Sequence, residues 1–97
     1  MEKTVRIINQ SALQTRKFMD RKTGEERVMN SVTLKLTDGI DTFLADVMGE
    51  RAVNCPKYDP THLYRAQFSM TVREWDSQQT GEHLQANTIY LDKMIAL

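Results

Sequence analysis

Residues 64–73 alternate strictly between apolar and polar side chains, and no other stretch of the chain restricts its fold so strongly. The even positions are apolar and the odd positions are polar or charged: Tyr64, Ala66, Phe68, Met70 and Val72, against Arg65, Gln67, Ser69, Thr71 and Arg73. A period of two is typical of a β-strand that buries one of its faces. The segment 63–75 therefore predicts a strand with one face against a core.

Four further strands are expected, at 3–19, 27–37, 40–48 and 83–95. Turn signals that contain glycine separate them, at 20–24, 38–39 and 77–81. The first strand is long, and a bulge expected at 9–12 would let it serve two sides of a barrel. The chain is therefore predicted to be all-β.

One short insertion separates the third expected strand from the fourth. Residues 50–54 favour a single helical turn, and Pro56 and Pro60 prevent a longer helix. Five strands with one insertion after the third are the layout of the OB-fold, a five-stranded Greek-key β-barrel. We expect one such domain over residues 1–97, with an SH3-like barrel or another small β-meander as the alternative.

Size and composition set further limits. With 97 residues, of which 40% are hydrophobic, the core is modest, and a homodimer or homotetramer is expected. No apolar run approaches the roughly 20 residues that span a membrane, and no secretory signal follows Met1. Cys55 is the only cysteine, which excludes an intramolecular disulfide and favours a cytoplasmic location.

The charge of the chain is balanced in total but not along its length. The formal net charge is zero, which argues against a strongly electrostatic nucleic-acid binder. Residues 1–35, however, carry eight Lys and Arg against four Asp and Glu, whereas the remainder carries five against nine. Either the folded surface is polarised, or it is an ordinary mixed surface.

No arrangement of residues points to catalysis. His62 and His83 lie near strand ends without a cysteine or carboxylate at ligand spacing, and Cys55 has no candidate base nearby. No glycine-rich phosphate loop is present. We expect neither an enzyme nor a metal site or cofactor.

Trp75 is the residue that most favours a binding function. It shares the expected outward face of its strand with Arg65 and Arg73. A tryptophan in that setting can stack on an unpaired base while the guanidinium groups meet phosphates. The alternative is that Trp75 caps the open end of the barrel with Arg73 laid over it as a cation–π partner.

The segment 71–76, with a short turn and then Gly81, resembles a segment of the bacterial single-stranded DNA-binding (SSB) proteins. Those proteins carry an Arg-x-Trp-x-Asp-x-x-Gly-like motif, and here two extra residues lie between Asp76 and Gly81. Three other stretches are similar to their first hairpin, their step into the short helix and their closing strand: 22–36, 48–52 and 87–97. The resemblance thus covers most of the chain.

The resemblance implies that Trp75 stacks on DNA bases and that Arg73 contacts a phosphate, in sequence-independent binding that supports replication, repair or transfer. The third strand differs, since only Phe43 partly matches the family's aromatic set there. The sequence stops directly after the last strand, without the family's acidic tail. It therefore looks more like the primosomal replication protein B branch, or a short homologue from a mobile element, both built as oligomers by strand pairing.

The first hairpin adds a basic candidate surface. Its loop often flanks the binding groove in this type of barrel, so phosphate attraction is expected from four residues: Lys17, Arg21, Lys22 and Arg27. The alternative is a solvated hairpin tip. For the whole chain, the competing functions are a protein-interaction OB domain without nucleic-acid binding and, last, RNA binding.

Overall fold

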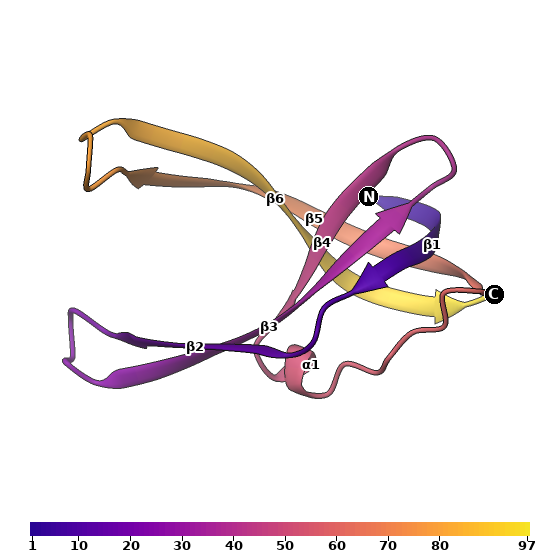
Figure 1. Ribbon diagram of the computed structural model, residues 1–97, viewed down its shortest axis with the longest axis horizontal. Coiled ribbons are helices and arrows are strands. Elements are labelled where there is room, and N and C mark those ends of the chain that lie inside the picture. Colours follow the sequence, from indigo (N-terminus) through magenta and orange to yellow (C-terminus); the bar gives the residue numbers. More distant parts are fainter.

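The computed structural model describes residues 1–97, and it is an all-β structure of six strands and one short helix (Figure 1). In chain order the elements are β1 (Glu2–Gln10), β2 (Gln14–Met19), β3 (Glu26–Thr37), β4 (Thr42–Met48), α1 (Glu50–Val53), β5 (Leu63–Asp76) and β6 (His83–Ala96). The single helix has four residues, and the structure holds no helix long and apolar enough to cross a lipid bilayer.

The strands form one hydrogen-bonded sheet in the order β1-β5-β6-β4-β3-β2. β1 is shared between two neighbours: its first half pairs with β5 and its second half with β3, where the register shifts between Ile7 and Asn9. All pairings are antiparallel except that of β4 with β6, which is a single parallel pair, Asp46 with Tyr90. β1, at one end of this order, thus also pairs with β3, which is next to the other end.

The predicted strands are confirmed in position, and the expected break in the first strand divides it in two. Residues 11–13 separate β1 from β2, so that six strands are present and not five. The break has a structural cause: β1 pairs with the second half of β3, whereas β2 pairs with its first half. The expected helical turn is present as α1, and the chain after it runs without regular structure to β5.

The core consists of twelve buried side chains, all of them apolar or aromatic: Val5, Ile7, Val32, Leu34, Leu36, Ala45, Val47, Ala52, Tyr64, Ala66, Phe68 and Leu91. Phe43 packs edge-on against Phe68, with ring centroids 5.4 Å apart. The hydroxyl of Tyr64 accepts a hydrogen bond from the backbone N–H of Asp59 at 2.9 Å, which satisfies its polar end. Apart from Ala52 of α1, the core residues are the alternating inner positions of the strands.

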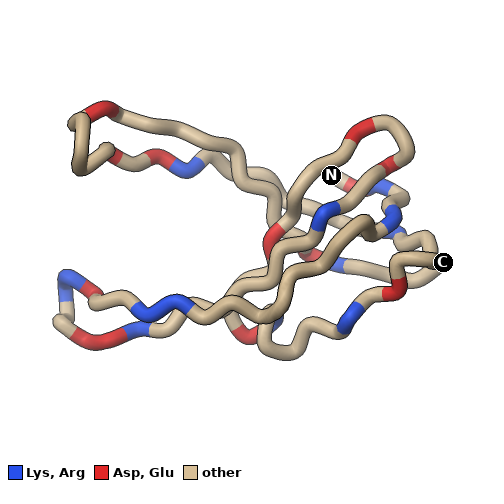
Figure 2. Tube along the Cα trace, viewed as in Figure 1, with Lys and Arg blue, Asp and Glu red and all other residues tan.

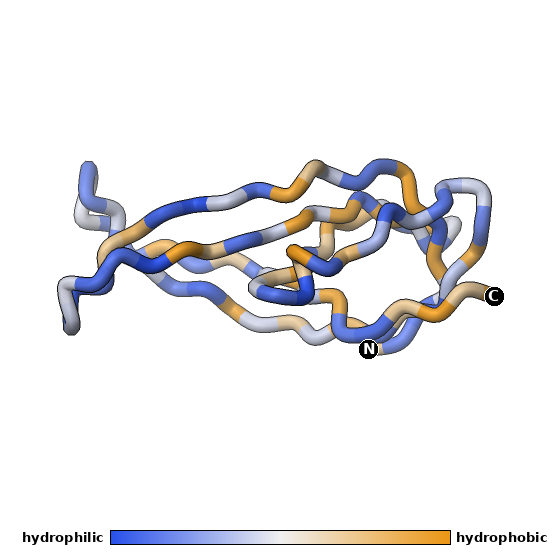
Figure 3. Tube along the Cα trace, turned by 90° about the horizontal axis from the view of Figure 1, so that it is seen from below, coloured by the Kyte–Doolittle hydropathy of each residue, from blue (hydrophilic) through white to orange (hydrophobic).

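Two hairpins extend beyond this core as two-stranded ribbons on the same side of the molecule (Figure 1). We call residues 14–31, from β2 and β3, the first arm, and residues 69–90, from β5 and β6, the second arm. The apolar alternation continues into both arms, as Figure 3 indicates, but nothing covers it there: Val28, Met70 and Val72 are 52%, 55% and 54% exposed. We call the part of the molecule that contains the core the body. The faces predicted to be buried are thus buried only in the halves of the strands that lie in the body.

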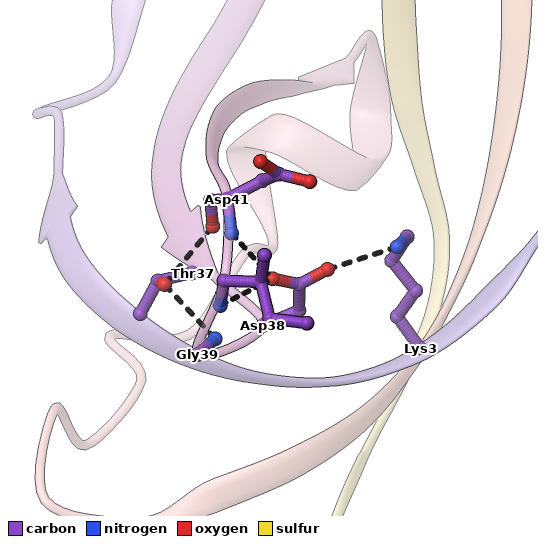
Figure 4. A network of polar contacts seen from close by, with 6 residues as sticks. Lys3, Thr37, Asp38, Gly39 and Asp41 are labelled. Atoms are coloured by element: carbon purple, nitrogen blue, oxygen red, sulfur yellow. Dashed lines mark hydrogen bonds and ion pairs between the residues drawn. The ribbon is translucent and has the colours of Figure 1, made fainter.

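The turn between β3 and β4 lies at the opposite end of the molecule from the arms, and Asp38 organises it (Figure 4). Its carboxylate accepts hydrogen bonds from the backbone N–H groups of Ile40 and Asp41 at 2.9 and 2.7 Å and pairs with Nζ of Lys3 at 2.9 Å. These hydrogen bonds hold the pKa of Asp38 well below its usual range. The contact between Lys3 and Asp38 raises the pKa of Lys3. The turn is thereby tied to β1.

Candidate nucleic-acid interface

Trp75 lies near the tip of the second arm, on one face of the ribbon. Pairing of β5 with β6 sets Leu84 opposite Trp75 and Ala86 opposite Arg73 on this face. The guanidinium carbon of Arg73 lies 5.5 Å from the centroid of the Trp75 ring. The indole is 41% exposed and stands on the arm, so it does not cap the body, although the expected cation–π contact with Arg73 is present.

The first arm carries a matching arrangement that was not predicted. In the register of β2 with β3, Phe18 lies opposite Arg27 and Arg16 lies opposite Met29, which places all four on one face. Phe18 is 41% exposed, like Trp75. The signal in the sequence is a shared Arg-x-aromatic pattern, at 16–18 and 73–75, which sets an arginine and a ring on the same side of an extended strand.

A hollow of about 500 Å³ lies between the roots of the two arms. Its lining combines side chains from both arms, from β4 and from α1: Met29, Asp46, Met48, Arg51, Ser69, Tyr90, Leu91 and Asp92. Met29 belongs to the face of the first arm that carries Phe18, and Ser69 and Tyr90 belong to the face of the second arm that carries Trp75. Both Arg-aromatic faces therefore contribute residues to the lining of one hollow.

The charged side chains that line this hollow are Asp46, Asp92 and Arg51. Asp46 accepts a hydrogen bond from the hydroxyl of Thr33 at 2.9 Å, and Asp92 accepts one from the hydroxyl of Ser69 at 2.6 Å. Arg51 donates a hydrogen bond to the backbone carbonyl of Asp92 and not to its carboxylate. The carboxylates of Asp46 and Asp92 therefore have no ion-pair partner. With two carboxylates against one guanidinium, the lining has a net negative charge, which favours the N–H edge of a base over a phosphate.

The predicted basic residues of the first arm fall into two groups. Lys17 and Arg27 are engaged within the arm, at 4.0 Å from Glu26 and 3.1 Å from Asp20. Lys17 also points to the face opposite Phe18. Arg21 and Lys22 lie in the turn at the tip of the arm and have no ion pair (Figure 2). Arg16, on the Phe18 face, has no ion pair either. The free cations are therefore Arg16, Arg21 and Lys22.

Arg65 lies apart from this group. Its guanidinium pairs with Glu2 at 2.5 Å, in the body of the molecule. Ten residues of extended strand separate it from Trp75, which corresponds to about 33 Å. Arg65 therefore does not reach the phosphates on either side of a base stacked on Trp75, although both residues occupy the same side of β5 in the alternation.

The remaining reactive side chains form no second site. His83 lies between two carboxylates of the second arm, 3.0 Å from Asp76 and 3.6 Å from Glu74. Burial raises the pKa of the Cys55 thiol, which keeps it protonated at neutral pH. No group of three or more His, Cys, Asp or Glu side chains is placed to hold a metal ion.

No family model, no curated protein and no solved structure matches this chain. The similarity of residues 71–81 to the SSB proteins stays a prediction. The function is therefore inferred from the geometry of the arms and of the hollow that they line.

Proposed function

We propose that this chain is an OB-fold barrel that binds single-stranded nucleic acid, DNA by preference, largely without regard to sequence. The observation that carries the proposal is the pair of Arg-aromatic faces, one on each arm, that both contribute residues to the lining of a common hollow. Proteins that bind single strands without sequence preference combine aromatic rings, on which bases stack, with cations along the path of the phosphate backbone. Support for DNA replication, repair or transfer is the corresponding role.

The strand pairings support the barrel. They run in a circuit, from β1 to β5, β6, β4 and β3 and back to β1. In OB-folds the second and third strands bind the ligand, between the loop that joins strands one and two and the loop that joins strands four and five. With β1 and β2 as one interrupted strand, those loops are the tips of the two arms and those strands are β3 and β4.

The chemistry of binding follows from the position of each group. Bases stack on Phe18 and Trp75, and Tyr90, which is half-buried at the hollow, offers a third ring between them. Phosphates stay outside the acidic hollow and meet the guanidinium groups of Arg16 and Arg73. Stacking is worth roughly 1–3 kcal/mol per base and depends little on which base it is, since every base has a π-face.

Tryptophan fluorescence tests the proposal directly, because Trp75 is the only tryptophan. Oligo-dT should quench its emission, with an affinity that falls as salt is raised. Oligo-rU and duplex DNA of the same length serve as comparisons at two salt concentrations. Equal binding of oligo-rU would remove the preference for DNA, and the absence of binding to any of the three at low salt would overturn the proposal.

A protein-interaction module is the second candidate, and the exposed apolar side chains of the arms are the observation that favours it. Val28, Met70 and Val72 are all more than half exposed. Such side chains gathered on a surface mark contact with another macromolecule. In that case no oligonucleotide would quench Trp75.

A further inference from the structure

A row of polar side chains crosses four strands on the outer face of the body, at the hollow that both arms line. Thr33 of β3 pairs with Asp46 of β4, Asp46 pairs with Tyr90 of β6, and Tyr90 pairs with Ser69 of β5. Directly paired residues have their side chains on the same face of a sheet. Asp46, Tyr90 and Ser69 all line the hollow. A ligand there meets an aromatic ring and a carboxylate side by side.

The carboxylate of Asp46 is oriented by its neighbour and can still accept further hydrogen bonds. One of its oxygens accepts a hydrogen bond from the hydroxyl of Thr33 at 2.9 Å, and the group forms no ion pair. A carboxylate offers about four lone-pair positions, so more donors can bind to it. Asp46 is half-buried, and hydrogen bonds to an ionised group are the strong ones. The position therefore suits a ligand with N–H donors and no negative charge.

Guanine is the one base of DNA whose unpaired edge presents two adjacent N–H donors, at N1 and at the exocyclic N2. Adenine and cytosine place their amino group beside a ring nitrogen that accepts, and thymine has a single N–H between two carbonyl oxygens. A carboxylate binds two parallel donors at once but repels the lone pairs of an acceptor. In a single strand this edge is free for such a contact.

We propose that the hollow selects guanine at one position of the bound strand, with N1–H and N2–H donated to the carboxylate of Asp46 and the ring stacked on Tyr90. Arg51 is the donor for O6 of the same edge, because its guanidinium has further N–H groups besides the one given to the carbonyl of Asp92. The inference rests on the proposed function and deepens it. Stacking on Phe18 and Trp75 is indifferent to sequence, whereas the hollow recognises one base.

A single change in the oligonucleotide is the first test. The central thymine of oligo-dT is replaced by guanine or by hypoxanthine, which differs from guanine only in lacking the N2 amino group. We expect the strand with guanine to bind about tenfold more tightly by anisotropy, because hypoxanthine loses one of the two donors to Asp46. The protein is the same in both measurements, so the result does not depend on the folding of a variant.

Substitution of the carboxylate is the second test. Asp46→Asn should bring the ratio of the two affinities to about one, because an amide has a single acceptor oxygen and its NH₂ group opposes the second donor. Asp41→Asn is the matched control: Asp41 is an exposed carboxylate without an ion pair in the turn remote from the arms, and the tenfold ratio should remain. A ratio lost with Asp92→Asn but kept with Asp46→Asn would overturn the assignment to Asp46.

The failure of this inference can be told apart from that of the proposed function. Equal affinity for strands with guanine, hypoxanthine and thymine, with Trp75 still quenched, would overturn the inference alone, whereas no binding of any strand would overturn both. Free dGMP presents the same edge but lacks the stacking at Phe18 and Trp75, so it should displace the strand only at millimolar concentration. Displacement at micromolar concentration would assign the hollow to a free nucleotide and overturn the inference.

Discussion

At the scale of single residues, two aromatic side chains define the candidate interface. Trp75 and Phe18 are equally exposed, and each shares its strand face with an arginine two residues earlier in the chain. An exposed ring beside a guanidinium without an ion pair offers a flat apolar surface and a positive charge together. The ring matches the base of a nucleotide, and the charge matches its phosphate.

Replacing the indole should weaken binding without unfolding the chain. Trp75→Ala removes a stacking surface worth roughly 1–3 kcal/mol, so the dissociation constant for oligo-dT should rise about ten- to hundredfold. Trp75→Phe should recover much of the loss, since a smaller ring still stacks. Anisotropy of a labelled oligonucleotide measures both variants. Unchanged affinity with a dissociated oligomer would identify Trp75 as an interface residue.

Replacing Phe18, on the first arm, should also weaken the binding of oligo-dT. Phe18→Ala should raise the dissociation constant for oligo-dT about tenfold or more, because the second stacking surface is lost. Ile40→Ala, a truncation of an exposed apolar residue outside the arms, is the control and should have no effect. Loss of affinity at Trp75 but not at Phe18 would confine the nucleic acid to the second arm.

At the scale of elements, the arms and the turns carry separate tasks. The tip of the first arm presents Arg21 and Lys22, which have no ion pair, whereas Lys17 and Arg27 are engaged by acids of the same hairpin. Cations without partners are the ones available to phosphates. The tip is therefore the part of the arm expected to set the salt dependence of binding.

Arg21→Ala combined with Lys22→Ala should weaken binding of oligo-dT and flatten its salt dependence. Each lost contact with a single strand removes about 0.7 from the slope of log affinity against log salt concentration. Lys57→Ala is the control, because Lys57 is also an exposed cation without an ion pair but lies outside the arms. An unchanged slope would mean that the tip points away from the nucleic acid.

The turn after β3 should make stability sensitive to acid. Since the folded protein lowers the pKa of Asp38 below its usual value of 3.8, the ionised form stabilises the fold above that pH and this contribution is lost as pH falls below it. Asp38→Asn keeps an acceptor but not the charge. Its free energy of unfolding, measured with urea, should lie below that of the native chain at pH 7, and the difference should shrink progressively as pH falls below about 4. A constant difference from pH 7 to pH 2 would mean that hydrogen bonding, and not charge, accounts for the effect.

At the scale of the whole molecule, the arrangement of charge is a property of the fold. The net charge of zero conceals a first arm with an excess of cations and a second arm with an excess of acids (Figure 2). The hollow that residues of both arms line holds two carboxylates without an ion pair. Balanced total charge is compatible with nucleic-acid binding when the cations lie where phosphates pass.

The sequence by itself determined where the strands lie, because alternation and turn residues are local signals. The positions of β3 to β6 and of α1, the break in the first strand and the placing of Trp75 beside Arg73 all followed from spacing along the chain. The pattern predicts which side chains share a face. It contains nothing about how far a neighbouring strand extends over that face.

Only the tertiary structure decided what covers each face. Val28 and Val32 have the same place in the alternation of β3, yet Val32 is buried and Val28 is exposed, because β4 pairs with β3 only from Ser31 onward. Arg65 shares a strand side with Trp75 but lies in the body, paired with Glu2. Phe18 shares a face with Met29, which lines the hollow, only because β2 pairs with β3 in one particular register. Cover, distance and register depend on contacts between residues far apart in the chain, which no local pattern contains.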